Sequence, residues 1–393
     1  MNPLLIENAL IVKPGESVAH GSLLIIGAKI AALNPAVLPP DVVRLDAGGK
    51  RVTPGLIDLH THGVGQFMYD HIEQVAEASR YIATRGCTSA FPTIVPLAGP
   101  KLLGSLESLA LILDKAPGAR LPGIHLEGPF MAVPGAACPL LSGDLVLLGE
   151  LIAACQGRLS IMSLSPDTQN IIPVIERLVE CGVVPFITHT RGTAEQAQAA
   201  IAAGARHATH FYDVFYSPPE YEPGVRPMGV IEAFMADSRT TVDFICDGCH
   251  VPPLVVQAWV AALGWSRVML ITDSNIGAGL PAGVYDTPWG YKVRVKPGDG
   301  ARIAEGPQMN ALAGSALTMD VGMANLLKWL SPLPPAQVWA MGSLNPANLM
   351  KKPTLGRLEP GAEADLVMWS DDLKPVRTWV AGSTVFESSN PPE

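Results

Sequence analysis

The middle of the chain alternates short apolar runs with segments of helical periodicity, which is the pattern of an α/β protein. The predicted strands are GLIDLH, CTSAFPT, GIHLEGP, RLSIMSLSP, VVPFITHT, HATHFYD, TVDFICDGCH and VMLITDSN. The predicted helical segments are 74–85, 104–115, 171–181, 193–203, 230–236, 255–263 and 337–350. Eight such strands with helices in most intervals predict a TIM-type (β/α)₈ barrel over residues 53–354. A doubly wound open sheet is the alternative architecture.

Both ends of the chain contain strand-like runs without a helix of useful length between them. The runs lie at 4–12, 22–33, 42–52, 356–370 and 376–388, with Gly-rich or Pro-rich turns between them. We therefore expect residues 1–52 and 355–393 to pair into one small β-sandwich domain. A Gly-rich insert, 282–311, follows the eighth predicted strand of the barrel.

The reactive side chains of the barrel segment fall where the predicted strands end. They are His60, His62, Thr93, Glu127, Ser163, Ser165, His189, His210, Asp247, His250 and Asp273. In a barrel the carboxyl ends of all strands meet at one face, where catalytic residues sit. Five of the nine histidines are in this set, so the pattern predicts a cluster of imidazoles at that face.

Taken singly, these residues carry only a modest signal. His60 and His62 point to the same face of a strand, so both can reach one ion. A lone strand-end histidine such as His189 is more often a hydrogen-bonded structural residue, and an aspartate such as Asp273 often caps a turn. Taken together, they form a nitrogen and oxygen ligand set suited to Zn²⁺ or a similar divalent ion. The candidate metal ligands are His60, His62, Glu127, His189, His210 and Asp273.

Composition and charge narrow the class of partner. The formal net charge is −9, which disfavours a nucleic-acid partner. The six cysteines are scattered, and a single CxxC at Cys246 and Cys249 is a weak zinc signal. No run of apolar residues reaches membrane-spanning length, and no basic leader opens the chain. We expect a cytoplasmic protein that acts on a small molecule.

Several motifs together resemble a known family. PGLIDLHTHG, HLEGPF, the THT and ATH histidine pair, DGCH, ITDSN and LAGSALTM occur in this order between residues 53 and 319. They resemble the N-acetylglucosamine-6-phosphate deacetylase-like branch of the amidohydrolase superfamily. The resemblance implies a metal-dependent barrel joined to a small β domain, amide hydrolysis, one or two divalent ions (Zn²⁺ first among them) and a homodimer.

The resemblance also implies metal ligands. It places the main metal site at Glu127, His189 and His210, and a second site, which some members lack, at His60 and His62.

Two further site roles follow from the resemblance. Asp273 is the implied general acid/base: it takes a proton as metal-activated hydroxide attacks the N-acyl carbonyl, and it returns that proton to the departing amine. His250 is the implied substrate contact, and Leu312 lies in the segment that lines the acyl pocket.

The chain departs from the family pattern where the family binds phosphate. Ala137, Asp213 and Tyr221 stand where the family usually has a histidine, an asparagine and an arginine. Arg191 could bind an anion instead, or form a salt bridge with Glu195 or Asp213. We therefore expect the chemistry to be kept and the substrate to differ. The alternatives are a hydrolase of a non-phosphorylated N-acyl or cyclic amide, and a binding barrel without catalysis.

Overall fold

The computed structural model describes residues 2–96, 100–135, 138–287, 290–296 and 298–389. Its larger unit is a sheet of eight strands in which every neighbouring pair is parallel and the order follows the chain. The strands are β6 (Leu56–Thr61), β9 (Cys87–Ile94), β10 (Ile124–Glu127), β11 (Leu159–Leu164), β12 (Val184–Ile187), β13 (His207–Ala208), β14 (Thr241–Ile245) and β15 (Val268–Ile271). Each predicted strand is present.

The sheet closes between its first and last strands. A parallel bridge joins Thr61 to Ser274, and the N–H of His62 donates to the carbonyl oxygen of Ser274 at 2.8 Å. The two edges therefore meet, so the fold is the expected (β/α)₈ barrel, and the open-sheet alternative is wrong.

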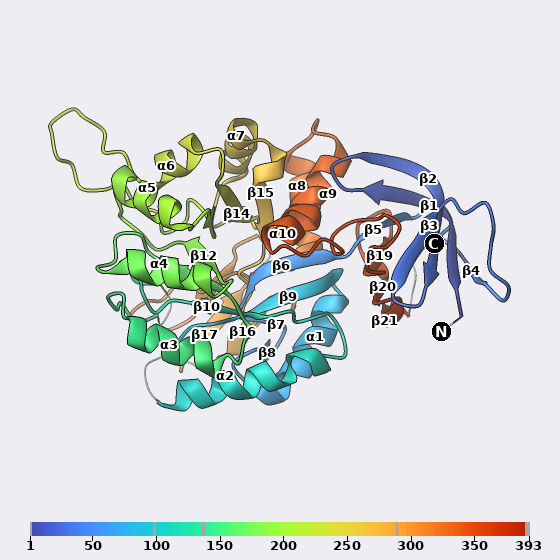
Figure 1. Cartoon of the computed structure of the whole chain (residues 1–393), viewed down its shortest axis with the longest axis horizontal. Helices are drawn as coiled ribbons and strands as arrows, with labels where there is room; N and C mark the ends of the chain where they lie inside the picture. The colour runs from blue at the N-terminus through green and yellow to red at the C-terminus, as the bar shows by residue number, and fades with distance from the viewer. Residues whose placement is uncertain (1, 97–99, 136–137, 288–289, 297, 390–393) are drawn as a thin grey trace.

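Helices cover the outside of the barrel (Figure 1). They are α1 (Val75–Ala83), α2 (Pro100–Ile112), α3 (Leu145–Ala154), α4 (Ile171–Glu180), α5 (Ala194–Ala203), α6 (Val230–Ala236), α7 (Pro253–Leu263), α8 (Met319–Trp329), α9 (Pro335–Gly342) and α10 (Leu344–Leu349). Short 3₁₀ turns occur at Ile72–Gln74, Leu113–Lys115 and Trp265–Arg267. Helix α4 shows why they pack: Ile171, Val174, Ile175 and Leu178 recur at helical spacing and are buried.

The smaller unit combines both ends of the chain in one sheet, as Figure 1 shows on the right. Its strands are β1 (Leu4–Lys13), β2 (Ser17–Ile26), β3 (Lys29–Leu33), β4 (Val43–Asp46), β5 (Arg51–Pro54), β19 (Leu366–Trp369), β20 (Pro375–Val380) and β21 (Ser383–Glu387). Ile30 on β3 and Trp379 on β20 belong to one buried cluster. Strands from opposite ends of the sheet therefore share a core, which gives the expected β-sandwich. The division at 52/53 and 354/355 stays a prediction.

The insert after the eighth strand has structure of its own. Strands β16 (Gly283–Asp286), β17 (Lys292–Val295) and β18 (Ala301–Ile303) form an antiparallel sheet, and Val293, Ala301 and Ile303 belong to its small core. A two-stranded hairpin, β7 (Gly63–Val64) and β8 (Phe67–Met68), follows β6.

Within the described residues, no helix combines the length and the apolar character needed to cross a membrane.

Candidate metal centre

The six candidate ligands come together at the carboxyl ends of the barrel strands, with Glu127 in the middle. One carboxylate oxygen of Glu127, Oε1, lies 3.2 Å from Nε2 of His210, 3.5 Å from Nε2 of His189 and 3.7 Å from Nε2 of His60. Its other oxygen, Oε2, lies 3.2 Å from Nε2 of His62. Four imidazole nitrogens therefore converge on a single buried carboxylate.

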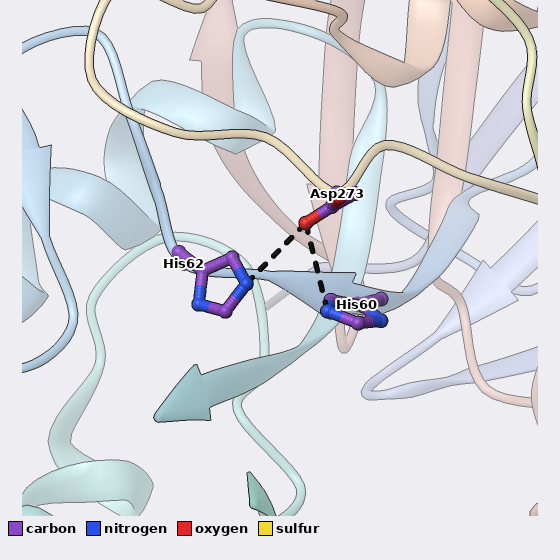
Figure 2. A group of neighbouring side chains, drawn as sticks. All are labelled: His60, His62 and Asp273. Carbon is purple, nitrogen blue, oxygen red and sulfur yellow. Dashed lines mark ion pairs between the residues drawn. The ribbon is translucent and has the colours of Figure 1, made fainter. Parts of the chain in front are cut away.

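Asp273 adds a second carboxylate to this cluster. Its Oδ1 lies 3.3 Å from Nε2 of His62 and 3.5 Å from Nε2 of His60 (Figure 2). Two groups have ligand atoms within 4.8 Å of one another: His60, His62 and Asp273, and His60, Glu127 and His210. Because His60 belongs to both groups, they form one continuous polar centre rather than two separate sites.

His60 on β6 and His62, directly after it, are oriented by hydrogen bonds on the side away from the centre. Nδ1 of His62 lies 3.1 Å from the carbonyl oxygen of Thr93, which can only accept, so Nδ1 is the donor. Nδ1 of His60 lies 3.1 Å from Oγ1 of Thr209. Both rings thus turn Nε2 toward the carboxylates. A hydrogen bond at the other ring nitrogen, here Nδ1, is what orients metal-binding histidines.

The imidazole nitrogens and carboxylate oxygens of the centre fit a divalent cation. Nε2 of His60 is buried without a hydrogen-bond partner among the described residues, although it faces Glu127 and Asp273. A buried polar atom without a partner costs free energy and calls for an explanation. Imidazole nitrogens and carboxylate oxygens are the ligands that zinc accepts, so a cation held here would satisfy this atom and both carboxylates.

The electrostatics of the centre point the same way. Burial disfavours charged imidazole, but hydrogen bonds to Asp273 and Glu127 outweigh burial and raise the pKa of His62 to about 10. Burial lowers the pKa of His210, but the hydrogen bond and charge of Glu127 outweigh burial and raise the pKa to about 9. Burial opposes ionisation of Asp273 as well, yet the charge of His60 and the hydrogen bond from His62 lower its pKa. The two neighbouring carboxylates thus favour positive charge, which protons or a divalent cation can supply.

Three of the six residues adopt a left-handed backbone. The φ angles are 45° at His189, 35° at His210 and 47° at Asp273. Such values are rare for residues other than glycine and concentrate at functional sites. Each strand therefore turns sharply just where its side chain enters the centre.

An ion pair inside the barrel holds one of these turns, and sequence reasoning missed it. Oδ1 of Asp243 accepts the backbone N–H of His210 at 2.6 Å, while Oδ2 lies 2.9 Å from Nε2 of His207. Both side chains of this pair are fully buried. The available signal was Asp243 itself, because an aspartate inside an apolar strand needs a buried partner.

Gly135 is a second residue that sequence reasoning missed. A Cβ atom placed on it would lie 1.7 Å from Cε1 of His189, so only glycine fits against this ring. The neighbouring N–H of Val133 donates to the carbonyl oxygen of His189 at 3.1 Å. The loop after β10 therefore packs directly on a candidate ligand from β12.

A cavity of about 570 Å³ opens onto the centre. Of the predicted substrate contacts, Asp213, His250 and Leu312 line it. The insert supplies part of the wall through Tyr291, Ile303, Gln308, Met309 and Ala311, and Leu312 directly follows it in the chain. The insert is thus part of the cavity, which its Gly-rich sequence did not indicate.

Two other predicted contacts lie away from the cavity wall. Tyr221 is 70% exposed and is not among the lining residues. Arg191 is exposed, and its guanidinium lies 4.4 Å from the ring centroid of Tyr216. Within the described part of the chain, Arg191 forms no ion pair with Glu195 or Asp213; it stacks on an aromatic ring instead. Ala137 lies outside the described residues.

His250 is held at the cavity by its neighbour Asp247. Nδ1 of His250 lies 2.7 Å from Oδ2 of Asp247, and both side chains are buried. Burial lowers the pKa of His250, but the hydrogen bond and charge of Asp247 outweigh it and raise the pKa above its usual value. Of the nearby cysteines, Sγ of Cys246 donates to the carbonyl oxygen of Phe244, and Sγ of Cys249 to that of Gly298.

Comparison with known proteins agrees with this geometry. The amidohydrolase family model matches residues 257–385. The N-acetylglucosamine-6-phosphate deacetylase of Vibrio furnissii is 33% identical over 356 residues, covering 88% of this chain and 85% of that protein. The N-acetylgalactosamine-6-phosphate deacetylase of Escherichia coli O157:H7 is 31% identical over 368 residues, covering 92% of this chain and 93% of that protein.

A solved structure extends the similarity to the whole fold. It is a variant of the N-acetyl-D-glucosamine-6-phosphate deacetylase of Mycobacterium smegmatis in complex with N-acetyl-D-glucosamine-6-phosphate. Its TM-score to this chain is 0.84 at 29% identity, and the match covers 98% of this chain and 99% of that one. The chain therefore belongs to the amidohydrolase family, in the branch of the N-acetylglucosamine-6-phosphate deacetylases, and is a hydrolase of non-peptide carbon–nitrogen bonds.

Proposed function

We propose that this protein is a metal-dependent deacetylase of a small N-acyl compound, with an N-acyl amino sugar without phosphate as the first candidate. The observation that carries the proposal is the convergence of four imidazole Nε2 atoms on Glu127. A barrel that only bound a ligand would have no use for a second carboxylate, Asp273, beside this cluster.

Glu127, His189 and His210 would hold the main ion, and His60 and His62 a second one, with Zn²⁺ as the metal that suits this ligand set. A bound divalent ion lowers the pKa of its water to about 7 and polarises a carbonyl oxygen.

The chain's own residues would then move the proton. Asp273 has a lowered pKa, so it is ionised and ready to accept a proton from the attacking water. It returns that proton to the amine nitrogen, which is a poor leaving group until protonated. His250, held by Asp247, would contact the substrate from the cavity wall, and Leu312 would pack against the acyl group.

The wall of the cavity supports a substrate without phosphate. Among the residues that the structure describes, no lysine or arginine lines it, whereas Asp213 does. A charge-assisted contact to phosphate contributes about 1.5–3 kcal/mol, so losing two would cost roughly two to four decades in affinity or rate. We propose that N-acetylglucosamine 6-phosphate is a poor substrate here. We further propose that the protein is a cytoplasmic homodimer.

The test compares metal content and hydrolysis on one preparation. We expect up to two equivalents of zinc by elemental analysis, and one equivalent in His62→Ala. A panel of N-acetyl sugars, their 6-phosphates, N-acyl amino acids and cyclic amides should show turnover that chelation abolishes and zinc restores. Turnover that survives complete removal of metal would refute the proposed mechanism. Bound metal without turnover on any member would favour the binding barrel.

A further inference from the structure

One carboxylate on the cavity wall has no hydrogen-bond or ion-pair partner among the residues that the structure describes. The N–H of Asp213 donates to the carbonyl oxygen of His210 at 3.2 Å, which places Asp213 directly beside the metal centre. Its side chain is partly exposed and lines the cavity. Within the described ranges, no hydrogen bond or ion pair engages its carboxylate, although buried and half-buried acids generally find one.

Asp213 adds a carboxylate to the cavity wall that no ion pair among the described residues engages. Three lining carboxylates carry negative charge: Glu127, Asp213 and Asp273. Asp247 and His250 compensate each other through their hydrogen bond. Glu127 and Asp273 belong to the two candidate ligand groups, whereas Asp213 belongs to neither group and its carboxylate is left for a different contact.

Two arginines of the insert are engaged in hydrogen bonds of their own, and Arg191 stacks on Tyr216. Arg302 on the insert donates to Oδ1 of Asp299 at 2.7 Å and to the carbonyl oxygen of Asn310 at 2.9 Å. Arg294 donates to Oδ1 of Asn310 at 2.7 Å. None of these arginines lines the cavity, so a ligand is free to bring a cationic group to Asp213.

We infer that the substrate is an N-acyl compound whose amine part carries a second, protonated amine that pairs with Asp213. This inference rests on the proposed function and specifies its substrate class. An ammonium group donates charge-assisted hydrogen bonds to a carboxylate, a hydroxyl group donates neutral and weaker ones, and a phosphate is repelled. The compound can be a diamino sugar or an aliphatic diamine, since both offer the same ammonium group.

Binding to a metal-loaded, turnover-blocked protein tests this. In an Asp273→Asn background, calorimetry compares N-acetylglucosamine, its 6-amino-6-deoxy analogue and its 6-phosphate, which differ only at carbon 6. A second pair compares N-acetyl-1,4-diaminobutane with N-butylacetamide. In at least one series, the ammonium compound should bind about 10- to 100-fold more tightly than its uncharged partner, and the phosphate most weakly. A preference in the first series points to a diamino sugar, and one in the second to an aliphatic diamine.

The role of Asp213 is isolated by a matched pair of variants. Asp213→Asn keeps the shape and removes the charge, so it should abolish the preference for the ammonium compound. Glu220→Gln removes one charge from an exposed position on the same loop and should leave the preference intact. The preference should also shrink with added salt, a measurement that needs no variant.

Specific results would overturn the inference. One is equal binding of the ammonium compound and its uncharged partner in both series. Another is tightest binding of the 6-phosphate. A third is a preference for the ammonium compound that Asp213→Asn leaves unchanged. Because binding is read without turnover, these outcomes are separate from a failure of the proposed hydrolysis, which the unsubstituted chain reports in its own assay.

Discussion

The backbone N–H of Asp273 donates a hydrogen bond of 2.8 Å to the carbonyl oxygen of His60. This bond lies at the seam where β15 meets β6, next to the bridge between Thr61 and Ser274. The contacts that close the barrel therefore also set the distance between the side chains of Asp273 and His60. Oδ1 of Asp273 comes within 3.5 Å of Nε2 of His60 because the first and last strands pair at this point.

Removing one ligand of the main site should remove metal and activity together. His210→Ala deletes the imidazole 3.2 Å from Glu127, and we expect bound metal and kcat to fall in parallel. Elemental analysis and a deacetylation assay on the same sample check this. His20→Ala, an exposed histidine in the small β domain, is the control and should change neither quantity. Full activity of a metal-free His210→Ala protein would contradict the assignment.

Asp273→Asn should separate metal binding from chemistry. The amide still presents an oxygen to His60 and His62, so metal content should stay near that of the unsubstituted protein. It cannot carry a proton, so kcat should fall by roughly 10²–10⁴-fold. Asp286→Asn removes the same charge from an exposed side chain on β16 that does not line the cavity, and it should keep full turnover. Near-normal kcat in Asp273→Asn would show that another group carries the proton.

Gly135→Ala should damage the metal centre through a steric contact. The added methyl group would lie 1.7 Å from Cε1 of His189, so the ring or the loop has to move. We expect weaker zinc binding in a competition titration. Gly149→Ala, at an open position on α3, adds the same methyl group without a contact and should stabilise the protein by up to about 1 kcal/mol. Unchanged zinc affinity in Gly135→Ala would show that the loop adapts freely.

The pair of Asp247 and His250 should make stability depend on pH. Asp247 raises the pKa of His250 above its usual value of about 6.5, so the folded state holds this proton more tightly than the unfolded state does. The resulting stabilisation is complete below about pH 6.5 and is lost as the pH rises through the folded-state pKa. Urea unfolding at several pH values should show this loss, and Asp247→Asn should flatten that part of the profile. An identical profile in Asp247→Asn would exclude the pair as its source.

Much of the fold and of the centre followed from the sequence by itself. The apolar runs and the turn-forming residues between them located the eight strands, because a buried strand must be apolar and must end at a turn. Glu127 before Gly128 and Pro129, and His60 two residues before His62, revealed the site because parallel strands in a barrel deliver their carboxyl ends to one face. These features are local, so a single stretch of chain carries each of them.

Other features were decided only by contacts between residues far apart in the chain. Arg191 could have paired with Glu195, but the fold places its guanidinium over Tyr216 instead. Gly135 is required because His189, from another strand, occupies the space of a side chain. The insert became a cavity wall because Arg302 on β18 pairs with Leu312, which brings Ile303 and Leu312 to the cavity. Local propensity carries no information about such neighbours, so tertiary packing alone decided where these residues lie and what the cavity presents to a ligand.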